Sequence, residues 1–192
     1  MLTEGAARWL LLLHLALGVA AVGAATHLAI WLRPYLRGEF ARHRAVRRFA
    51  VIAFVLHAGG FVAGHVVYPT YRVEVRAAYL ENSAAVVRAT EAHQADVRVL
   101  AAREAVAASQ GAPASELIVG SAKAARWFDV KEHWVALGLF GSAGLLLMLA
   151  FWDPRRDDPA PAPVAFGLAL VVAGTLWIAA IIGVLSATWR AI

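Results

Sequence analysis

The 192-residue chain is 61% hydrophobic and 16% charged, with a mean hydropathy of +0.64, which is too apolar for a soluble domain of this size. It contains no cysteine, and this excludes disulfides, thiolate metal sites, iron–sulfur clusters and covalently attached haem. Much of the net charge of +5 reflects one arginine cluster beside apolar segments, so membrane topology explains it better than nucleic-acid binding does.

A helix needs about 20 mostly apolar residues to cross a bilayer. Four stretches meet this requirement without any Asp, Glu, Lys or Arg, namely residues 9–32, 49–68, 133–152 and 163–189. The sequence therefore predicts an all-α integral membrane protein with four transmembrane helices in an antiparallel bundle. The first stretch has a second interpretation as a cleaved signal peptide, because "VGAATHLA" offers small residues, although its apolar region is longer than signal peptides usually have.

The loops between these stretches predict the orientation. Residues 33–48 contain six arginines and one acid, Glu39, and the positive-inside rule places such a loop in the cytoplasm. The predicted chain has three parts. Residues 1–68 contain the first two transmembrane helices, residues 69–132 form an extracytoplasmic segment, and residues 133–192 contain the last two transmembrane helices. Both termini are expected outside a bacterial inner membrane. The protein as a whole is expected to contact the lipid bilayer and to bind no nucleic acid.

The extracytoplasmic segment is expected to form a helical hairpin. Pro69 should end the second transmembrane helix, because it lacks a backbone donor. Ser83 is the predicted N-cap of a helix over residues 83–109, "QGAPAS" at 110–115 is a break, and residues 116–128 form a second short helix. Such a hairpin either packs on the bundle or docks another membrane or periplasmic subunit.

Polar residues gather where the third apolar stretch begins. Asp129 and Glu132 have the spacing of a capping box, and both acids favour the positive end of a helix dipole. Lys131 can extend its amine to the headgroups. The sequence therefore predicts that a helix starts here at the membrane surface, and only His133 is not required by this interpretation.

Imidazoles are the titratable groups at membrane depth, and such groups are functional candidates. The helical rise of about 1.5 Å per residue gives the expected depth of each histidine in the membrane. By this depth the histidines form a set near the outer surface and a pair nearer the cytoplasm. The outer set is His14, His65 and His133, and the inner pair is His27 and His57. Neutral imidazole can ligate haem iron, or it can simply hydrogen-bond a neighbouring helix.

One outer b-type haem fits the sequence better than two. The 13-residue step from His14 to His27 turns about 220°, so these two rings leave the helix on different sides. His65, with either His14 or His133, is the predicted axial pair. Arg72, Arg76 and Lys131 would neutralise the propionates, or they are ordinary interface cations.

The favoured function is a small haem b electron-transfer protein, or the haem-bearing membrane anchor of a quinone-linked complex. The alternative is a non-catalytic accessory or assembly subunit that docks a partner through its external helices. A transporter would usually need a carboxylate in the membrane, which is absent. No catalytic constellation is present, and His57 with Ser142 is the one pairing left open.

Overall fold

The computed structural model describes residues 3–107 and 111–188, and within these ranges the chain is helical with no strand. Gln110 in the predicted break and Trp189 at the end of the predicted fourth helix lie outside the described residues. The described chain divides into two compact units. The smaller unit comprises residues 68–130 and 182–188, and the larger comprises residues 3–67 and 131–181.

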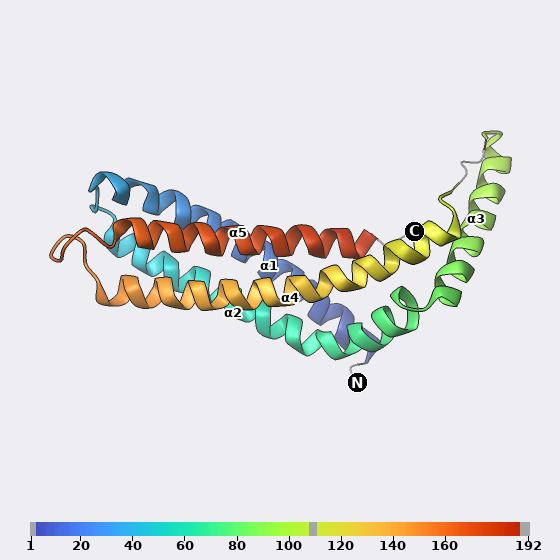
Figure 1. Ribbon diagram of the computed structural model, residues 1–192, viewed down its shortest axis with the longest axis horizontal. Helices are drawn as coiled ribbons and strands as arrows, with labels where there is room; N and C mark the ends of the chain where they lie inside the picture. The colour runs from blue at the N-terminus through green and yellow to red at the C-terminus, as the bar shows by residue number, and fades with distance from the viewer. Residues whose placement is uncertain (1–2, 108–110, 189–192) are drawn as a thin grey trace. The chain divides into compact units, whose positions relative to one another are not determined.

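Five α-helices and two short helices of other types follow one another along the described chain (Figure 1). They are α1 (Glu4–Leu32), the 3₁₀ helix η1 (Arg33–Arg37), α2 (His43–Thr70), the π-helix η2 (Tyr71–Leu80), α3 (Ser83–Glu104), α4 (Ala114–Phe151) and α5 (Ala162–Thr188). Four helical segments are long and apolar enough to cross a membrane, at residues 5–37, 43–80, 114–151 and 162–187. The prediction of an all-helical chain with four helices long and apolar enough to cross a membrane is confirmed.

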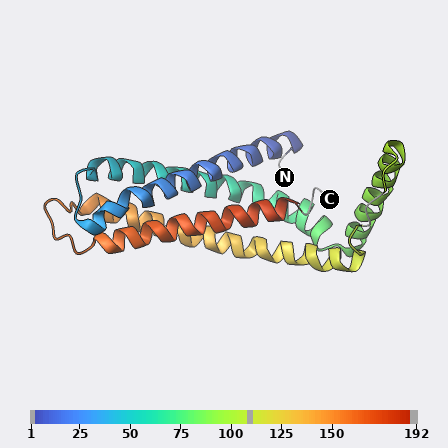
Figure 2. The ribbon, with the colours of Figure 1, turned by 90° about the horizontal axis from the view of Figure 1, so that it is seen from above.

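The larger unit has a core made mainly of small side chains. Its buried residues come from all four of its helices, and alanine is the commonest type among them, as the close approach of helices in lipid favours. The α1–α2 and α4–α5 connections lie at the same end of this unit (Figures 1 and 2). Large apolar side chains such as Leu15, Val19 and Ile181 are more than half exposed, which is typical of a surface that faces lipid rather than water.

The prediction that Pro69 ends the second helix is wrong. Pro69 lies inside α2, which continues to Thr70 and is followed directly by the π-helix η2. Proline lacks a backbone N–H group, so one carbonyl in the preceding turn loses its hydrogen-bond donor. The i→i+5 hydrogen bonds of the following π-helix are a way to satisfy carbonyls near this position. The helix therefore extends beyond the apolar stretch instead of stopping at it.

The helix predicted at 116–128 and the apolar stretch at 133–152 are one helix, α4. It begins just after Pro113, whose carbonyl accepts from the Glu116 amide. No glycine or proline occurs between residues 121 and 137, so nothing in the sequence interrupts it. The second arm of the predicted external hairpin is therefore the first part of α4 and not a separate helix.

Helix α3 is present, but it ends at Glu104, residues 105–107 of the predicted helix are not helical, residues 108 and 109 lie outside the described residues, and its cap differs. Asn82, not Ser83, is the N-cap, and its side chain accepts a hydrogen bond from the Ala85 amide at 3.1 Å. Asparagine is among the best N-cap residues because its side-chain oxygen satisfies an amide of the first turn. Along the whole helix only Val86 is buried, and Val99 and Leu100 are more than half exposed.

Candidate functional site

His14 lies in a notch formed by two glycines of α2. Its Nδ1 is 2.9 Å from the carbonyl oxygen of Gly60, so it donates a hydrogen bond there. A Cβ placed on Gly64 would come within 2.8 Å of the His14 ring carbon Cε1. The small-xxx-small pair Gly60 and Gly64 therefore lets α2 receive the imidazole of α1.

The other outer histidines are in more open positions. His65 is exposed, and its ring stacks on Phe61 with centroids 6.3 Å apart. His133 is also exposed, on α4. Among residues 3–107 and 111–188 there is no group of three or more His, Asp or Glu side chains that could hold a metal ion. The three outer histidines therefore do not form a metal centre by themselves.

The inner pair divides into one exposed and one buried ring. His27 is exposed on α1 beside Trp31 and Phe49, with ring centroids 5.8 and 6.1 Å away. His57 is 2% exposed, and its Nδ1 lies 3.4 Å from the Ser142 hydroxyl oxygen on α4. Because their surroundings differ so strongly, these two imidazoles are not equivalent ligands for one cofactor.

The surroundings of His57 are polar but tightly filled. Ser142 donates to the carbonyl of Leu139, and Thr175 on α5 donates to the carbonyl of Val172. A Cβ on Gly138 would collide with the Thr175 hydroxyl and approach the His57 ring to 3.1 Å. The His57 Nε2 is buried without a hydrogen-bond partner among the described residues, although the Val135 carbonyl interacts with the ring. This cluster joins three helices, α2, α4 and α5, through His57, Ser142 and Thr175.

The predicted capping box at Asp129 and Glu132 is wrong, because α4 begins at Ala114 and runs through both residues. Asp129 has another role, since its carboxylate accepts from the Arg76 guanidinium. Arg76 also donates to Glu81 at 2.8 Å. Sequence spacing could not show this, because the ion pair joins residues that are 53 positions apart.

The remaining predicted interface residues lie within four positions of Arg76 or Asp129 in the sequence. Arg72 is exposed on η2, and Lys131 and Glu132 are half-buried on α4. Since two carboxylates already occupy the Arg76 guanidinium, Arg76 is a poor candidate for binding haem propionates. An aromatic stack accompanies the ion pair in the smaller unit, where the rings of Tyr71 and Phe128 have centroids 4.0 Å apart.

A buried histidine that the sequence analysis missed lies at the first residue of α2. His43 is 3% exposed, and its Nδ1 is 3.0 Å from the Tyr35 hydroxyl of η1. The Trp152 ring makes a T-shaped contact with each of these two rings, with centroids 6.3 and 6.4 Å apart. His43 lies outside the apolar stretches. It precedes the buried residues Val46 and Ala50 by three and seven positions, so the helical period places it on the core face of α2. This spacing is the signal in the sequence that could have indicated its burial.

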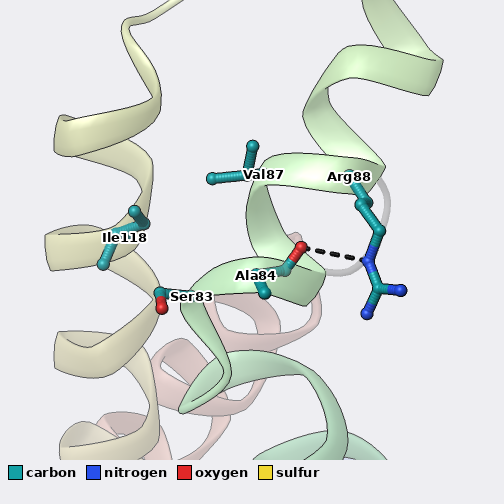
Figure 3. Close-up of a pocket in the computed structure, with 5 residues that line it drawn as sticks. All are labelled: Ser83, Ala84, Val87, Arg88 and Ile118. Carbon is teal, nitrogen blue, oxygen red and sulfur yellow. Dashed lines mark hydrogen bonds between the residues drawn. The ribbon is translucent and has the colours of Figure 1, made fainter.

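A shallow hollow in the smaller unit does not have the features of a ligand site. It measures about 560 Å³ and lies between α3 and the start of α4, where Val87 and Ile118 face one another (Figure 3). The Arg88 guanidinium donates to the carbonyl of Ala84 in its own helix. No convergent polar groups line the hollow, so it offers a ligand little beyond apolar contact.

Comparison of the chain with protein-family models, with curated proteins and with solved structures finds no match. Function must therefore be argued from the residues themselves. The features available are imidazoles that join helices, such as His14 and His57, imidazoles that are exposed on apolar helices, such as His27 and His65, and the helix α3, in which only Val86 is buried.

Proposed function

We propose that this protein is a non-catalytic accessory subunit of a bacterial inner-membrane complex. In this proposal α1, α2, α4 and α5 cross the bilayer as an antiparallel bundle, with residues 33–48 in the cytoplasm and both termini outside. The segment between α2 and α4 is extracytoplasmic. Other subunits contact the bundle within the bilayer and α3 outside it.

His27 is the observation that carries this proposal. It lies five residues before the end of α1, within the apolar stretch, and its ring is exposed. The aromatic rings of Trp31 and Phe49 lie beside it, and neither of its nitrogens has a hydrogen-bond partner in the described part of the chain. A polar group facing hydrocarbon without a partner is unfavourable by roughly 1–3 kcal/mol on protein scales. A helix of another subunit that offers a hydrogen-bonding side chain would remove this penalty.

The test is the integrity of the complex after extraction from native membranes in a mild detergent. We expect the wild-type chain to migrate with a stoichiometric partner, and His27→Leu to release that partner while the chain stays folded. His27→Gln keeps a hydrogen-bonding group and should retain the partner. Ala160→Leu, at an exposed position in the α4–α5 connection, is the control and should not affect retention of the partner. A wild-type chain that is extracted only as a monomer, or a complex that is insensitive to His27→Leu, would overturn the proposal.

A b-type haem protein is the second candidate, and the geometry of His14 favours it. A carbonyl oxygen can only accept, so the His14 Nδ1 that binds Gly60 carries the proton and Nε2 keeps its lone pair. Metal-ligating histidines commonly donate their other ring N–H to a backbone carbonyl in this way. His14 and His65 would then be the axial ligands, and the haem would supply one-electron transfer, either alone or as the anchor of a quinone-linked complex.

The visible spectrum separates the two candidates. If haem binds, protein purified from haem-replete cells should be coloured and should show a dithionite-reduced haem spectrum. His14→Ala and His65→Ala should each abolish that spectrum, whereas His93→Ala should not. A colourless preparation would eliminate the haem candidate and leave the accessory-subunit proposal unaffected.

A further inference from the structure

Exposed arginines surround the connection between α1 and α2. Of the six that the sequence places at residues 33–48, Arg37 is paired with Glu39 through its Nε at 2.7 Å. The other five are exposed, and no salt bridge to any of them is found within residues 3–107 and 111–188. We refer to these five as the arginine patch: Arg33, Arg42, Arg44, Arg47 and Arg48.

Helical geometry keeps the patch apart from the core. Arg44, Arg47 and Arg48 are three and four residues apart, so they share one face of α2. The core face of the same turns carries His43, Val46 and Ala50, which are buried. The guanidinium groups are therefore presented on the surface and are not used in packing α2 against its neighbours.

The patch lies at the boundary of the apolar segments. Arg33 directly follows the last residue of α1, and Phe49 directly follows Arg48. The rings of Trp31 and Phe49 pack with centroids 5.0 Å apart at this level, and aromatic side chains favour the membrane–water interface. The α4–α5 connection lies at the same end of the unit (Figures 1 and 2), but its Arg155 is paired with Asp153.

Charge explains why the patch should have a ligand. Five like charges within a short segment repel one another over the Debye length of about 8–10 Å, and the single acid of the segment is already paired with Arg37. A guanidinium matches a phosphate group in shape as well as in charge, because it donates two parallel hydrogen bonds. Basic clusters directly beside a transmembrane helix attract anionic lipids for this reason.

We propose that the arginine patch binds the phosphodiester headgroups of anionic phospholipids, in the leaflet at the α1–α2 connection. Phosphatidylglycerol and cardiolipin have the required chemistry. The interfacial position of the patch favours a lipid over a soluble acidic partner. This inference does not depend on the accessory-subunit proposal.

The experiment measures lipid binding to the purified full-length chain in a zwitterionic detergent. Phosphatidylglycerol and phosphatidylcholine are titrated separately, and retained lipid is counted by native mass spectrometry. The test variant replaces Arg44, Arg47 and Arg48 together with Gln, and a second variant replaces them with Lys. The matched control replaces three arginines of the polar helix α3 with Gln, at positions 88, 98 and 103.

We expect the wild-type chain to prefer phosphatidylglycerol, and the triple Gln variant to bind it more weakly by a factor on the order of 100. The Lys variant should keep much of the affinity, the α3 control should keep all of it, and added salt should weaken binding. Equal binding of both lipids, or a control as weak as the test variant, would overturn the proposal. Competition by millimolar inorganic phosphate would show a site for free phosphate and overturn the lipid assignment. If the triple variant does not fold, Arg48→Gln alone is measured instead, and it should bind phosphatidylglycerol more weakly than the wild-type chain does.

Discussion

The histidines of this chain show how one residue type takes different roles on the apolar helices. His14 donates to a backbone carbonyl of a neighbouring helix, and His57 contacts a serine hydroxyl, so both join helices. His27 and His65 are exposed and have only aromatic neighbours among the described ring contacts. The first two therefore contribute to the stability of the fold, and the last two are available to groups outside the chain.

The notch that holds His14 predicts a coupled pair of substitutions. Gly64→Ala should lower the free energy of unfolding by about 1–3 kcal/mol, because the new methyl group overlaps the His14 ring. In a His14→Ala background the same substitution should have little effect, since the ring is gone. Thermal unfolding of the four proteins in detergent measures this coupling.

Gly18→Ala is the control for the notch, because a Cβ there meets nothing within 4 Å. It should be neutral or slightly stabilising, given the better helix propensity of alanine. Equal effects of Gly64→Ala with and without His14 would show that the ring does not occupy the notch.

Individual helices in this protein extend further than their apolar stretches. η2 continues from α2 beyond Pro69, and α4 begins well before its apolar part. In the smaller unit these extensions meet through the Arg76–Asp129 ion pair and the Tyr71–Phe128 ring contact. Charged side chains beyond the apolar stretches are thus used for contacts between helices.

The start of α3 provides a matched pair of substitutions. Asn82→Ala removes the cap on the Ala85 amide and should destabilise the first turn by about 1 kcal/mol. Ser83→Ala, one residue later, should leave the turn unchanged. Amide hydrogen exchange at residues 83–87 is the measurement, and a larger effect of Ser83→Ala would contradict the assignment of Asn82 as the cap.

The α4–α5 connection should respond to acid through one carboxylate. Hydrogen bonds from Arg155 hold the pKa of Asp153 below its ordinary value of 3.8. Because the folded pKa is the lower one, ionised Asp153 stabilises the folded state above about pH 4, and this stabilisation is lost as the pH falls below that value. Thermal unfolding should therefore show Asp153→Asn to be destabilising at pH 7, with a difference that shrinks towards pH 3.

Arg155→Gln is the background that tests the cause. Without the guanidinium, the ionised form of Asp153 loses its main donor and keeps the backbone amide of residue 155, so Asp153→Asn should produce a much smaller pH-dependent difference. A difference that persists undiminished in this background would assign the effect to another partner of the carboxylate.

At the scale of the whole molecule, membrane topology can be mapped directly because the chain has no cysteine of its own. Single cysteines replace exposed alanines at position 41 in the α1–α2 connection, position 160 in the α4–α5 connection and position 102 in α3. With an impermeant maleimide added to cells whose outer membrane has been opened, only Ala102→Cys should be labelled. The other two should react only after the inner membrane is disrupted. Labelling of Ala41→Cys from outside would reverse the proposed orientation.

Length and hydropathy predicted the four apolar helices correctly, since both depend only on the residues of each segment. The continuous α4 was also readable in the sequence, because no residue between the polar cluster and the apolar part can stop a helix. Burial of His57 beside Ser142 was not predictable, since it depends on which faces of separate helices meet. The ion pair of Arg76 with Asp129 depends in the same way on residues far apart in the chain.

The alanine-rich core of the larger unit has a consequence for how this protein tolerates change. Residues such as Ala50, Ala165 and Ala169 are almost fully enclosed, so each contributes only a methyl group to the contact between helices. Shortening such a side chain removes very little volume, whereas lengthening it forces two backbones apart. Sequence drift along these faces is therefore expected to be one-sided, with exchanges among glycine, alanine and serine tolerated and larger residues excluded.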